Sequence, residues 1–387
     1  MEKYNHGDVA QKIMDAVQSE YKDLKKLNVM ILGKTGVGKS TLINNMFSDK
    51  LAETGVGKPV TTKIRKIEKP DFPLAIFDTP GLELGGENSV DSLLEEVTGQ
   101  IKAGIKSGDI SQAIHCILYC VGTPSHRFED TEITFLKRFL GETEYLNVPV
   151  IVVMTQSYSK KDAKALKAEI EKENLNIANV VPVLAEDYEI DDEYIAKAYG
   201  LDHLSEVMNN VIPEGVKKTF IAVQIASIDL KKGRAHAVVA AAAAVAAATG
   251  AIPIPGIPDA ALLVPEQITM LATITTTFGM PVEKSMLSAV VTGTIGTAST
   301  TVIGKSVVSN LLKLIPGFGS VIGGTISGAT AAALTAALGE AYIIILVKVT
   351  MGEISMSELG TNAGIEMISG VFKEQLKIKR DNSGRVI

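Results

Sequence analysis

Residues Gly33–Thr41 read GKTGVGKST and decide how the first half of the chain is organised. An apolar run, Leu27–Leu32, precedes this stretch and predicts a buried parallel strand, while Thr41–Phe47 can begin a helix. A strand, a glycine-rich loop and a helix, in that order, are the context in which the pattern G-x-x-x-x-G-K-[ST] binds phosphate. We therefore expect a nucleoside triphosphate site. The fixed positions of the pattern are Gly33, Gly38, Lys39 and Ser40.

The loop would offer its ligand both backbone donors and charged side chains. Its glycines let N–H groups converge on the β-phosphate, and the helix N-terminus adds partial positive charge. Lys39 would bridge the β- and γ-phosphates, and the Ser40 hydroxyl would bind Mg²⁺. A glycine-rich turn without a ligand is the alternative, and the flanking elements argue against it. The expected nucleotide-contacting residues are Gly33, Lys34, Thr35, Gly36, Val37, Gly38, Lys39, Ser40 and Thr41.

Composition limits the remaining possibilities. With 387 residues the chain has room for two or three domains, and its net charge of −6 gives no reason to expect a nucleic-acid partner. Cys116 and Cys120 lie in the apolar run Ala113–Val121, so we expect buried thiols in a strand rather than a metal site with His115. The first residues lack the apolar core of a signal peptide, so we expect cytosolic synthesis.

A second motif follows the next apolar run. Leu74–Phe77 predicts a short strand that ends in Asp78-Thr79-Pro80-Gly81, the pattern D-x-x-G. A carboxylate at that strand end can hold Mg²⁺ through water, and the glycine N–H can sense the γ-phosphate. Between the two motifs, Asp49–Thr62 is rich in glycine and leads into a polar–apolar alternating strand, which is typical of a switch segment.

Together these motifs resemble the first three G motifs of the TRAFAC-class small GTPases, close to the Era-like and immunity-related GTPases, over residues 27–201. The resemblance implies an α/β P-loop NTPase fold with a mainly parallel sheet and helices on both faces. It also implies GTP or GDP as ligand and Mg²⁺ as cofactor. The implied metal-holding residues are Ser40, Thr61 and Asp78, with Thr61 favoured over Thr62, while Gly81 would order on γ-phosphate binding.

The resemblance also bears on catalysis. Ras-like enzymes place a water-orienting Gln directly after D-x-x-G, and Leu82 stands there in this chain. We therefore expect slow hydrolysis unless a partner or a second protomer supplies the missing group. Residues Tyr119–Glu132 resemble the same segment of bacterial Era-like GTPases, which makes Arg127 a candidate catalytic finger. A surface arginine that serves as a cap or pairs with Glu129 is the favoured alternative. The expected catalytic residues are thus Lys39, Thr61, Gly81 and Arg127.

The expected base-binding motif departs from the family. The apolar run Val148–Thr155 ends in Thr155-Gln156-Ser157-Tyr158, at the place of the fourth motif, [NT]-K-x-D. Gln156 replaces the Lys that stacks on guanine, and Tyr158 replaces the Asp that pairs with its N1 and N2 groups. Asp162 could substitute only if the loop is longer. Ala185 stands in place of the fifth motif, so the expected base contacts are Thr155, Gln156 and Ala185, and GTP rests on the resemblance alone.

Composition changes sharply after Ile212–Gly215. We expect an amphipathic helix over 1–26, a GTPase domain over 27–212, an apolar helical domain over 213–376 and a polar tail over 377–387. Leu314–Gly339 is long enough to span a membrane, although Ala, Thr, Ser and Gly give it little transfer free energy. We expect 236–257 and 286–339 to associate with a membrane as a switchable hairpin. A tightly packed soluble bundle is the alternative.

This half resembles the helical domain numbered 697 among domains of unknown function, over residues 226–352. The matching residues are Ile252–Pro255, Asp259, Gln267, Leu314–Gly319, Leu334, Thr335 and Gly339. That resemblance implies a bacterial, membrane-linked GTPase at the cytoplasmic face. The resulting hypothesis is a GTP-hydrolysing switch that controls a helical domain, with a membrane surface and a second copy as further partners. The alternatives are a nucleotide-controlled scaffold with negligible hydrolysis and a soluble protein with altered base specificity.

Overall fold

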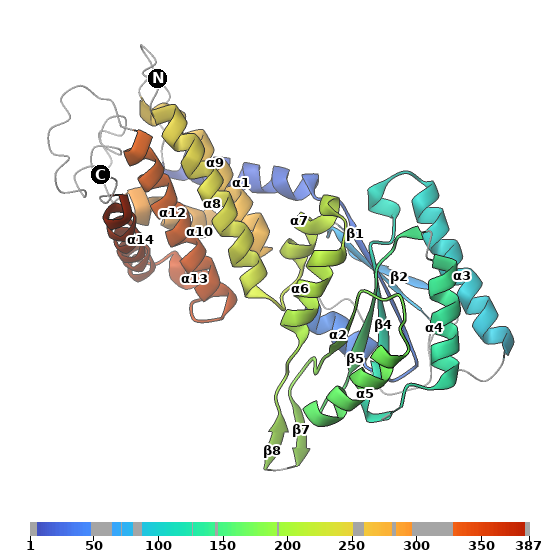
Figure 1. Cartoon of the computed structure of the whole chain (residues 1–387). Helices are drawn as coiled ribbons and strands as arrows, with labels where there is room; N and C mark the ends of the chain where they lie inside the picture. The colour runs from blue at the N-terminus through green and yellow to red at the C-terminus, as the bar shows by residue number, and fades with distance from the viewer. Residues whose placement is uncertain are drawn as a thin grey trace. The chain divides into compact units, whose positions relative to one another are not determined.

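A six-stranded sheet forms the centre of the N-terminal half in the computed structural model (Figure 1). The structure describes residues 6–47, 64–70, 72–79, 87–125, 127–143, 146–191, 193–250, 259–280, 284–295 and 328–383. The strand order is β2-β3-β1-β4-β5-β6, with β2 antiparallel to β3 and all other pairs parallel. The strands are β1 (Leu27–Gly33), β2 (Arg65–Glu68), β3 (Leu74–Asp78), β4 (Cys116–Gly122), β5 (Val150–Thr155) and β6 (Asn179–Pro182).

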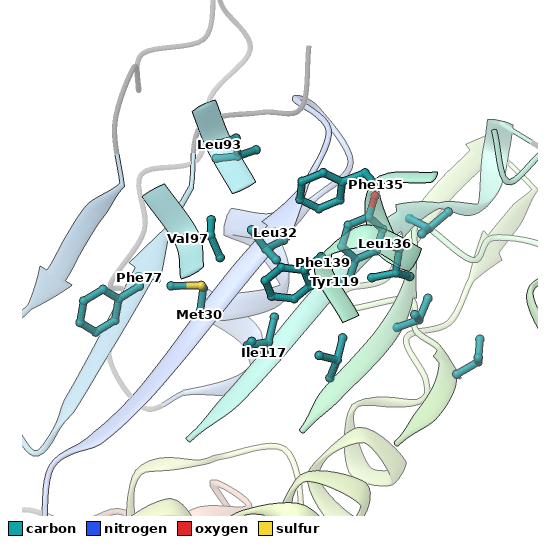
Figure 2. Close-up of a cluster of buried hydrophobic side chains, with 14 of the residues drawn as sticks. Met30, Leu32, Phe77, Leu93, Val97, Ile117, Tyr119, Phe135, Leu136 and Phe139 are labelled. Atoms are coloured by element: carbon teal, nitrogen blue, oxygen red, sulfur yellow. The ribbon is translucent and has the colours of Figure 1, made fainter. Parts of the chain in front are cut away.

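The central strands read as continuous apolar runs because helices cover both faces of the sheet. On one face, α3 (Glu87–Lys106), α4 (Asp130–Thr143) and α5 (Lys160–Lys172) enclose a cluster of buried side chains. Figure 2 shows Leu93 and Val97 of α3 and Phe135 and Phe139 of α4 gathered over side chains of the sheet. Phe135 stacks between Tyr119 and Phe139, with ring centroids 6.1 Å and 6.0 Å apart. The predicted fold class is confirmed.

The other face carries α2 (Lys39–Met46), α6 (Leu201–Val211) and α7 (Glu214–Val223). Both α2 and α7 contact β1, and α6 contacts α2, α7 and β6. A short antiparallel hairpin, β7 (Tyr188–Asp191) and β8 (Tyr194–Ala196), follows β6. Cys116 and Cys120 are buried free thiols in β4, as predicted. His115 accepts from the Asn28 N–H at 2.9 Å, so it ties β4 to β1.

The C-terminal half is helical. Its elements are α8 (Ile228–Gly250), α9 (Asp259–Phe278), α10 (Lys284–Ile295), α12 (Gly328–Thr350), α13 (Met356–Leu359) and α14 (Asn362–Ser383). Within this unit α12 packs against α8, α14 and α9, and α1 (His6–Asp23) packs against α9 and α10. Ala10, Ile13 and Val17 of α1 are fully buried in that cluster. Although it begins the chain, α1 is part of the helical unit.

The chain divides into two compact units, residues 24–227 and residues 1–23 with 228–387. This differs from the predicted boundaries at 26/27 and 212/213, because α1 joins the helical unit and α7 packs on β1. A short turn separates α7 from α8. In that turn, the Gln224 side chain donates to the Ser227 carbonyl and accepts from the Ser227 N–H, both at 2.8 Å. These bonds hold the turn that separates the two helices.

One helix in the described part of the chain, α12, is long and apolar enough to cross a membrane. Its most apolar window has a mean hydropathy of 1.8, and 61% of that window is buried inside the unit. A core helix of a soluble protein meets the same criterion. Within α12, Glu340 pairs with His236 of α8 at 3.0 Å. Residues 314–327 of the predicted span Leu314–Gly339 lie outside the described residues. Residues 251–257 of the predicted segment 236–257 also lie outside them.

Candidate nucleotide-binding site

The loop between β1 and α2 has the backbone that its glycines permit. Gly33, Gly36 and Gly38 have φ values of 139°, 79° and 90°, which L side chains rarely adopt. A Cβ atom at Gly33 would also lie 2.4 Å from the Cys120 carbonyl oxygen of the neighbouring strand. The loop therefore depends on glycine for its conformation and, at Gly33, for a close backbone approach.

Lys39 begins α2 and turns its side chain back over the loop. Its Nζ donates to the carbonyl oxygens of Gly33 and Lys34, both at 2.9 Å. Desolvation lowers the pKa of Lys39, against the opposing charges of Cys120 and Asp78. The ammonium group is thus held at the N-terminus of a helix, where the helix dipole also favours an anion.

Asp78 ends β3 beside the phosphate loop. It pairs in register with Ile31 of β1, two residues before the loop begins at Gly33. Its Oδ1 is buried and has no hydrogen-bond partner among the residues that the structure describes. Desolvation raises the pKa of Asp78, against the charges of Lys39 and Arg65. A buried carboxylate oxygen without a partner is costly, and a hydrated cation would satisfy it.

The donor set fits Mg²⁺, which prefers oxygen ligands and retains several waters. The Ser40 hydroxyl in the first turn of α2 and the Asp78 carboxylate at the end of β3 are such ligands. Thr61 and Gly81, the other predicted ligand and γ-phosphate sensor, lie outside the described residues, as does Leu82. Ser40 and Asp78 are therefore the described residues that could hold the metal.

The Lys34 side chain contacts acidic side chains outside the loop, whereas that of Lys39 contacts the loop's own carbonyls. Its Nζ pairs with Glu129 at 2.8 Å and Glu132 at 3.3 Å, which links the loop to the start of α4. Burial lowers the pKa of Lys34, but the two glutamates outweigh it and the net shift is upward. Among the described residues the Glu129 carboxylate pairs with Lys34, and no ion pair joins it to Arg127. Arg127 is exposed, and its role as a catalytic finger stays a prediction.

The end of β5 contacts the phosphate loop. Gln156 has a φ of 54°, and its Nε2 donates to the Gly36 carbonyl at 3.1 Å. Thr155 donates to the Val121 carbonyl at 3.1 Å and so fixes the strand end. A cavity of about 140 Å³ lies here, and its lining includes the predicted residues Gly38, Thr41, Thr155, Gln156 and Ala185. The structure therefore gathers residues of three separate motifs around one cavity.

Two further lining residues, Glu186 and Tyr188, were not predicted. The rings of Tyr188 and Tyr158 lie 4.2 Å apart between centroids, at an interplanar angle of 38°. Asp162 does not line the cavity, since it lies in the first turn of α5, where its N–H donates to the Ser159 hydroxyl at 3.2 Å. The sequence signal for Glu186 was its place directly after the fifth-motif position Ala185.

A family model described as Septin matches residues 24–199. Over these residues the chain is similar to septins and, as the next comparisons show, to Era-type GTPases. Human Septin-12 is 23% identical over 192 residues, which cover 44% of this chain and 53% of the relative. GTPase Era from Pseudomonas fluorescens (strain Pf0-1) is 26% identical over 191 residues, covering 48% and 55%. The chain therefore spans about half the length of the curated relatives it matches.

Solved GTPase structures are also similar to this domain. Era in complex with MgGDPNP and a segment of 16S ribosomal RNA is 23% identical, with a TM-score of 0.35 over 49% of this chain and 58% of that one. Cdc11 from Saccharomyces cerevisiae is 22% identical, with a TM-score of 0.27 over 44% and 70%. The septin match ends at residue 199, so the resemblance of the helical half to the domain numbered 697 stays a prediction.

Proposed function

We propose that this protein is a Mg²⁺-dependent GTP-binding and GTP-hydrolysing switch whose nucleotide state controls its helical unit. The observation that carries the proposal is the grouping of Lys39, Ser40 and Asp78 at the loop between β1 and α2. Three groups there would contact one ligand: a helix N-terminus, an ammonium group and a buried carboxylate oxygen without a partner among the described residues. Triphosphate with Mg²⁺ is the ligand that uses all three.

The chain's own residues would act by positioning and by charge. Lys39 would donate to the β- and γ-phosphates and offset the charge that develops during phosphoryl transfer. Ser40 and Asp78, together with Thr61, would orient the metal, which supplies further charge neutralisation when bound. Gly81 would respond to the γ-phosphate. The products are GDP and phosphate, and turnover is expected to be slow without a second protomer or another partner.

Replacing Asp78 with asparagine should remove most of the Mg²⁺ dependence of GTP binding. The amide keeps the shape of the side chain but loses the charge that holds the hydrated cation. We expect GTP affinity in Mg²⁺ to fall about tenfold or more, or about 1.4 kcal/mol. Affinity in EDTA should change by less than about threefold, because Lys39 and the loop remain. Titration of a fluorescent GTP analogue in both buffers measures the difference.

The matched control is Asp91→Asn, which removes an exposed carboxylate that pairs with Arg138 on the surface at 2.6 Å. That variant should bind GTP as the wild type does in both buffers. An Asp78→Asn protein that retains the full Mg²⁺ effect would contradict the proposed metal site.

A nucleotide-controlled scaffold is the second candidate, favoured by Leu82 at the position of the water-orienting glutamine. Phosphate release at two protein concentrations separates the candidates. A rate per protomer that rises with concentration supports hydrolysis activated by a second copy. A near-zero rate at both concentrations, with GTP binding intact, supports the scaffold.

The nucleotide state would be coupled to the helical unit through the end of α2. The Ile225 N–H donates to the Met46 carbonyl at 2.9 Å, and Phe47 forms an antiparallel bridge with Gln224. Met46 ends α2, the helix that begins with Lys39 and Ser40, and Phe47 lies two residues before the predicted switch segment Asp49–Thr62. Residues 224–227, which these contacts and the Gln224–Ser227 hydrogen bonds hold, directly precede α8. A shift of α2 between nucleotide states would therefore act on the start of the helical unit.

Replacing Gln224 with alanine should weaken this link while leaving GTP binding within about twofold. Gln224 is fully buried, and its two side-chain bonds to Ser227 hold the turn before α8. In the wild type we expect hydrogen exchange of α8 amides to differ between the GTP-analogue and GDP states. In Gln224→Ala that difference should shrink by at least half. The control is Gln112→Ala, which removes an exposed side chain that donates to Asp109 at 3.4 Å.

The opposite result is equally clear. An α8 exchange difference that survives in Gln224→Ala, with GTP affinity unchanged, would show that coupling does not pass through this turn.

The proposed site of action is the cytoplasmic face of a membrane, with 236–257 and 286–339 as contacting segments. The apolar character of α12 supports that part of the proposal.

A further inference from the structure

The cavity beyond the phosphate loop has a place for the base of a nucleotide. Gly38 and Thr41, from the loop and the first turn of α2, form part of its lining. Tyr158, Glu186 and Tyr188 contribute to the same lining from segments after β5 and β6. A nucleotide whose phosphates lie in the loop would extend its base into this space, because the loop and the cavity share residues.

The aromatic part of the lining cannot read the base by charge. Tyr158 stands where related GTPases carry the carboxylate that pairs with guanine, and its ring packs on Tyr188. Burial raises the pKa of Tyr158, and the charges of Tyr188 and Glu186 raise it further. The phenol therefore stays neutral, and Glu186 lines the same cavity.

Glu186 and its neighbour Asp187 differ in what they contact. Asp187 accepts from Lys197 Nζ and from the Ala198 N–H, both at 2.8 Å, so its carboxylate is occupied. Glu186 has no hydrogen-bond or ion-pair partner in the described part of the chain, and it lines the cavity. It is the one carboxylate among the described lining residues. Its side chain is exposed and so can approach a ligand without losing an existing bond.

Guanine has a chemical feature that an ionised carboxylate fits. On its Watson–Crick edge the N1–H and the N2 amino group are both donors, and an ionised carboxylate only accepts. Adenine places an acceptor, N1, opposite the same carboxylate, so one carboxylate oxygen would face a lone pair instead of a donor. Mismatched polar groups of this kind give large discrimination between otherwise similar ligands.

We propose that Glu186 is the residue that reads guanine, in place of the carboxylate that Tyr158 lacks. This inference rests on the proposed GTP function and adds the specificity-determining residue. The Tyr158–Tyr188 pair forms the apolar wall beside the base, and the carboxylate pairs with the N1 and N2 donors.

The test uses the full chain and four nucleotides, GTP, ATP, inosine triphosphate and xanthosine triphosphate, with affinities measured by competition against a fluorescent analogue in Mg²⁺. The wild type should prefer GTP over ATP by tenfold or more and bind inosine triphosphate, which lacks the N2 amino group, less well than GTP. Glu186→Gln should lose at least tenfold in GTP affinity. It should gain affinity for xanthosine triphosphate, because the amide N–H can donate to the 2-oxo group that replaces the amino group.

Two further variants make the result specific. Asp187→Asn changes the adjacent carboxylate and should keep the wild-type preference, and Glu186→Asp should retain part of it. The gain in xanthosine triphosphate binding shows that Glu186→Gln is folded. The inference is overturned if the wild type shows no GTP preference, if Glu186→Gln keeps that preference, or if Asp187→Asn alone loses it. Failure of the proposed function is distinct, because then the wild type binds none of the four nucleotides.

Discussion

Replacing Lys39 with alanine is expected to lower GTP affinity about 100-fold or more and to abolish phosphate release. The Lys39 ammonium lies over the loop, held by the Gly33 and Lys34 carbonyls at 2.9 Å. With a triphosphate bound, it would exchange these neutral acceptors for phosphate oxygens. Two charge-assisted hydrogen bonds of about 1.5 kcal/mol each give about 3 kcal/mol, or about two decades in Kd. Equilibrium titration with a fluorescent GTP analogue measures the loss.

A matched variant guards against a non-specific charge effect. Lys172→Ala removes the same charge from the surface of α5, where Lys172 pairs with Glu169 at 2.6 Å. That protein should bind and hydrolyse GTP as the wild type does. Melting temperatures of both variants report folding. Full turnover in a folded Lys39→Ala protein would contradict the assignment of this loop as a nucleotide site. Loss of GTP binding in both variants would instead indicate a bulk electrostatic effect.

The phosphate half of the site could be predicted because its determinants are contiguous in sequence. Gly33, Gly38 and Lys39 lie on one loop, and the apolar runs before and after it specify a strand and a helix. Asp78 could be placed because parallel strands that pair in register bring their carboxyl ends together. Buried strands on both sides of the loop were likewise evident from continuous apolar runs.

Thr155, Gln156 and Ala185 were predicted to line the cavity, but the contributions of Glu186 and Tyr188 could not be predicted in the same way. Tyr188 and Glu186 reach the cavity from the segment after β6, and their proximity to Tyr158 arises from the pairing of β5 with β6. No local pattern in the sequence encodes that contact. The same reason explains Lys34, whose charge partners Glu129 and Glu132 come from the start of α4. Side-chain pairing between distant segments is a property of the folded sheet.

The division into compact units differs from the predicted domain boundaries for a related reason. The amphipathic pattern of α1 shows that one face is buried but does not identify the surface that covers it. In the structure, Ala10, Ile13 and Val17 of α1 share a buried cluster with residues of α9 and α10. At the other boundary, helical periodicity continues through Gln224–Ser227, and the break there depends on a buried amide that bonds across the turn. Helical periodicity in the sequence does not predict that hydrogen bond.

The helical unit itself should respond strongly to one added methyl group. A Cβ atom at Gly339 of α12 would lie 2.4 Å from Cγ2 of Val239 in α8 and 3.0 Å from the sulfur of Met270 in α9. Val239 is buried and β-branched, so it cannot turn aside. We expect Gly339→Ala to lower the free energy of unfolding of this unit by about 2 kcal/mol, which overpacking costs typically reach. Thermal and urea denaturation measure the change.

Gly370→Ala in α14 is the control, and its sign should be opposite. A Cβ atom there meets nothing within 4 Å, so the methyl group only improves helix propensity, by about 1 kcal/mol. Two identical substitutions in helices of one unit thus separate backbone preference from packing. If Gly339→Ala also stabilises the protein, α8 and α12 do not approach closely in solution. If it destabilises as expected, glycine at 339 is required for the tight contact of α12 with α8 and α9, which a loosely associated hairpin would not need.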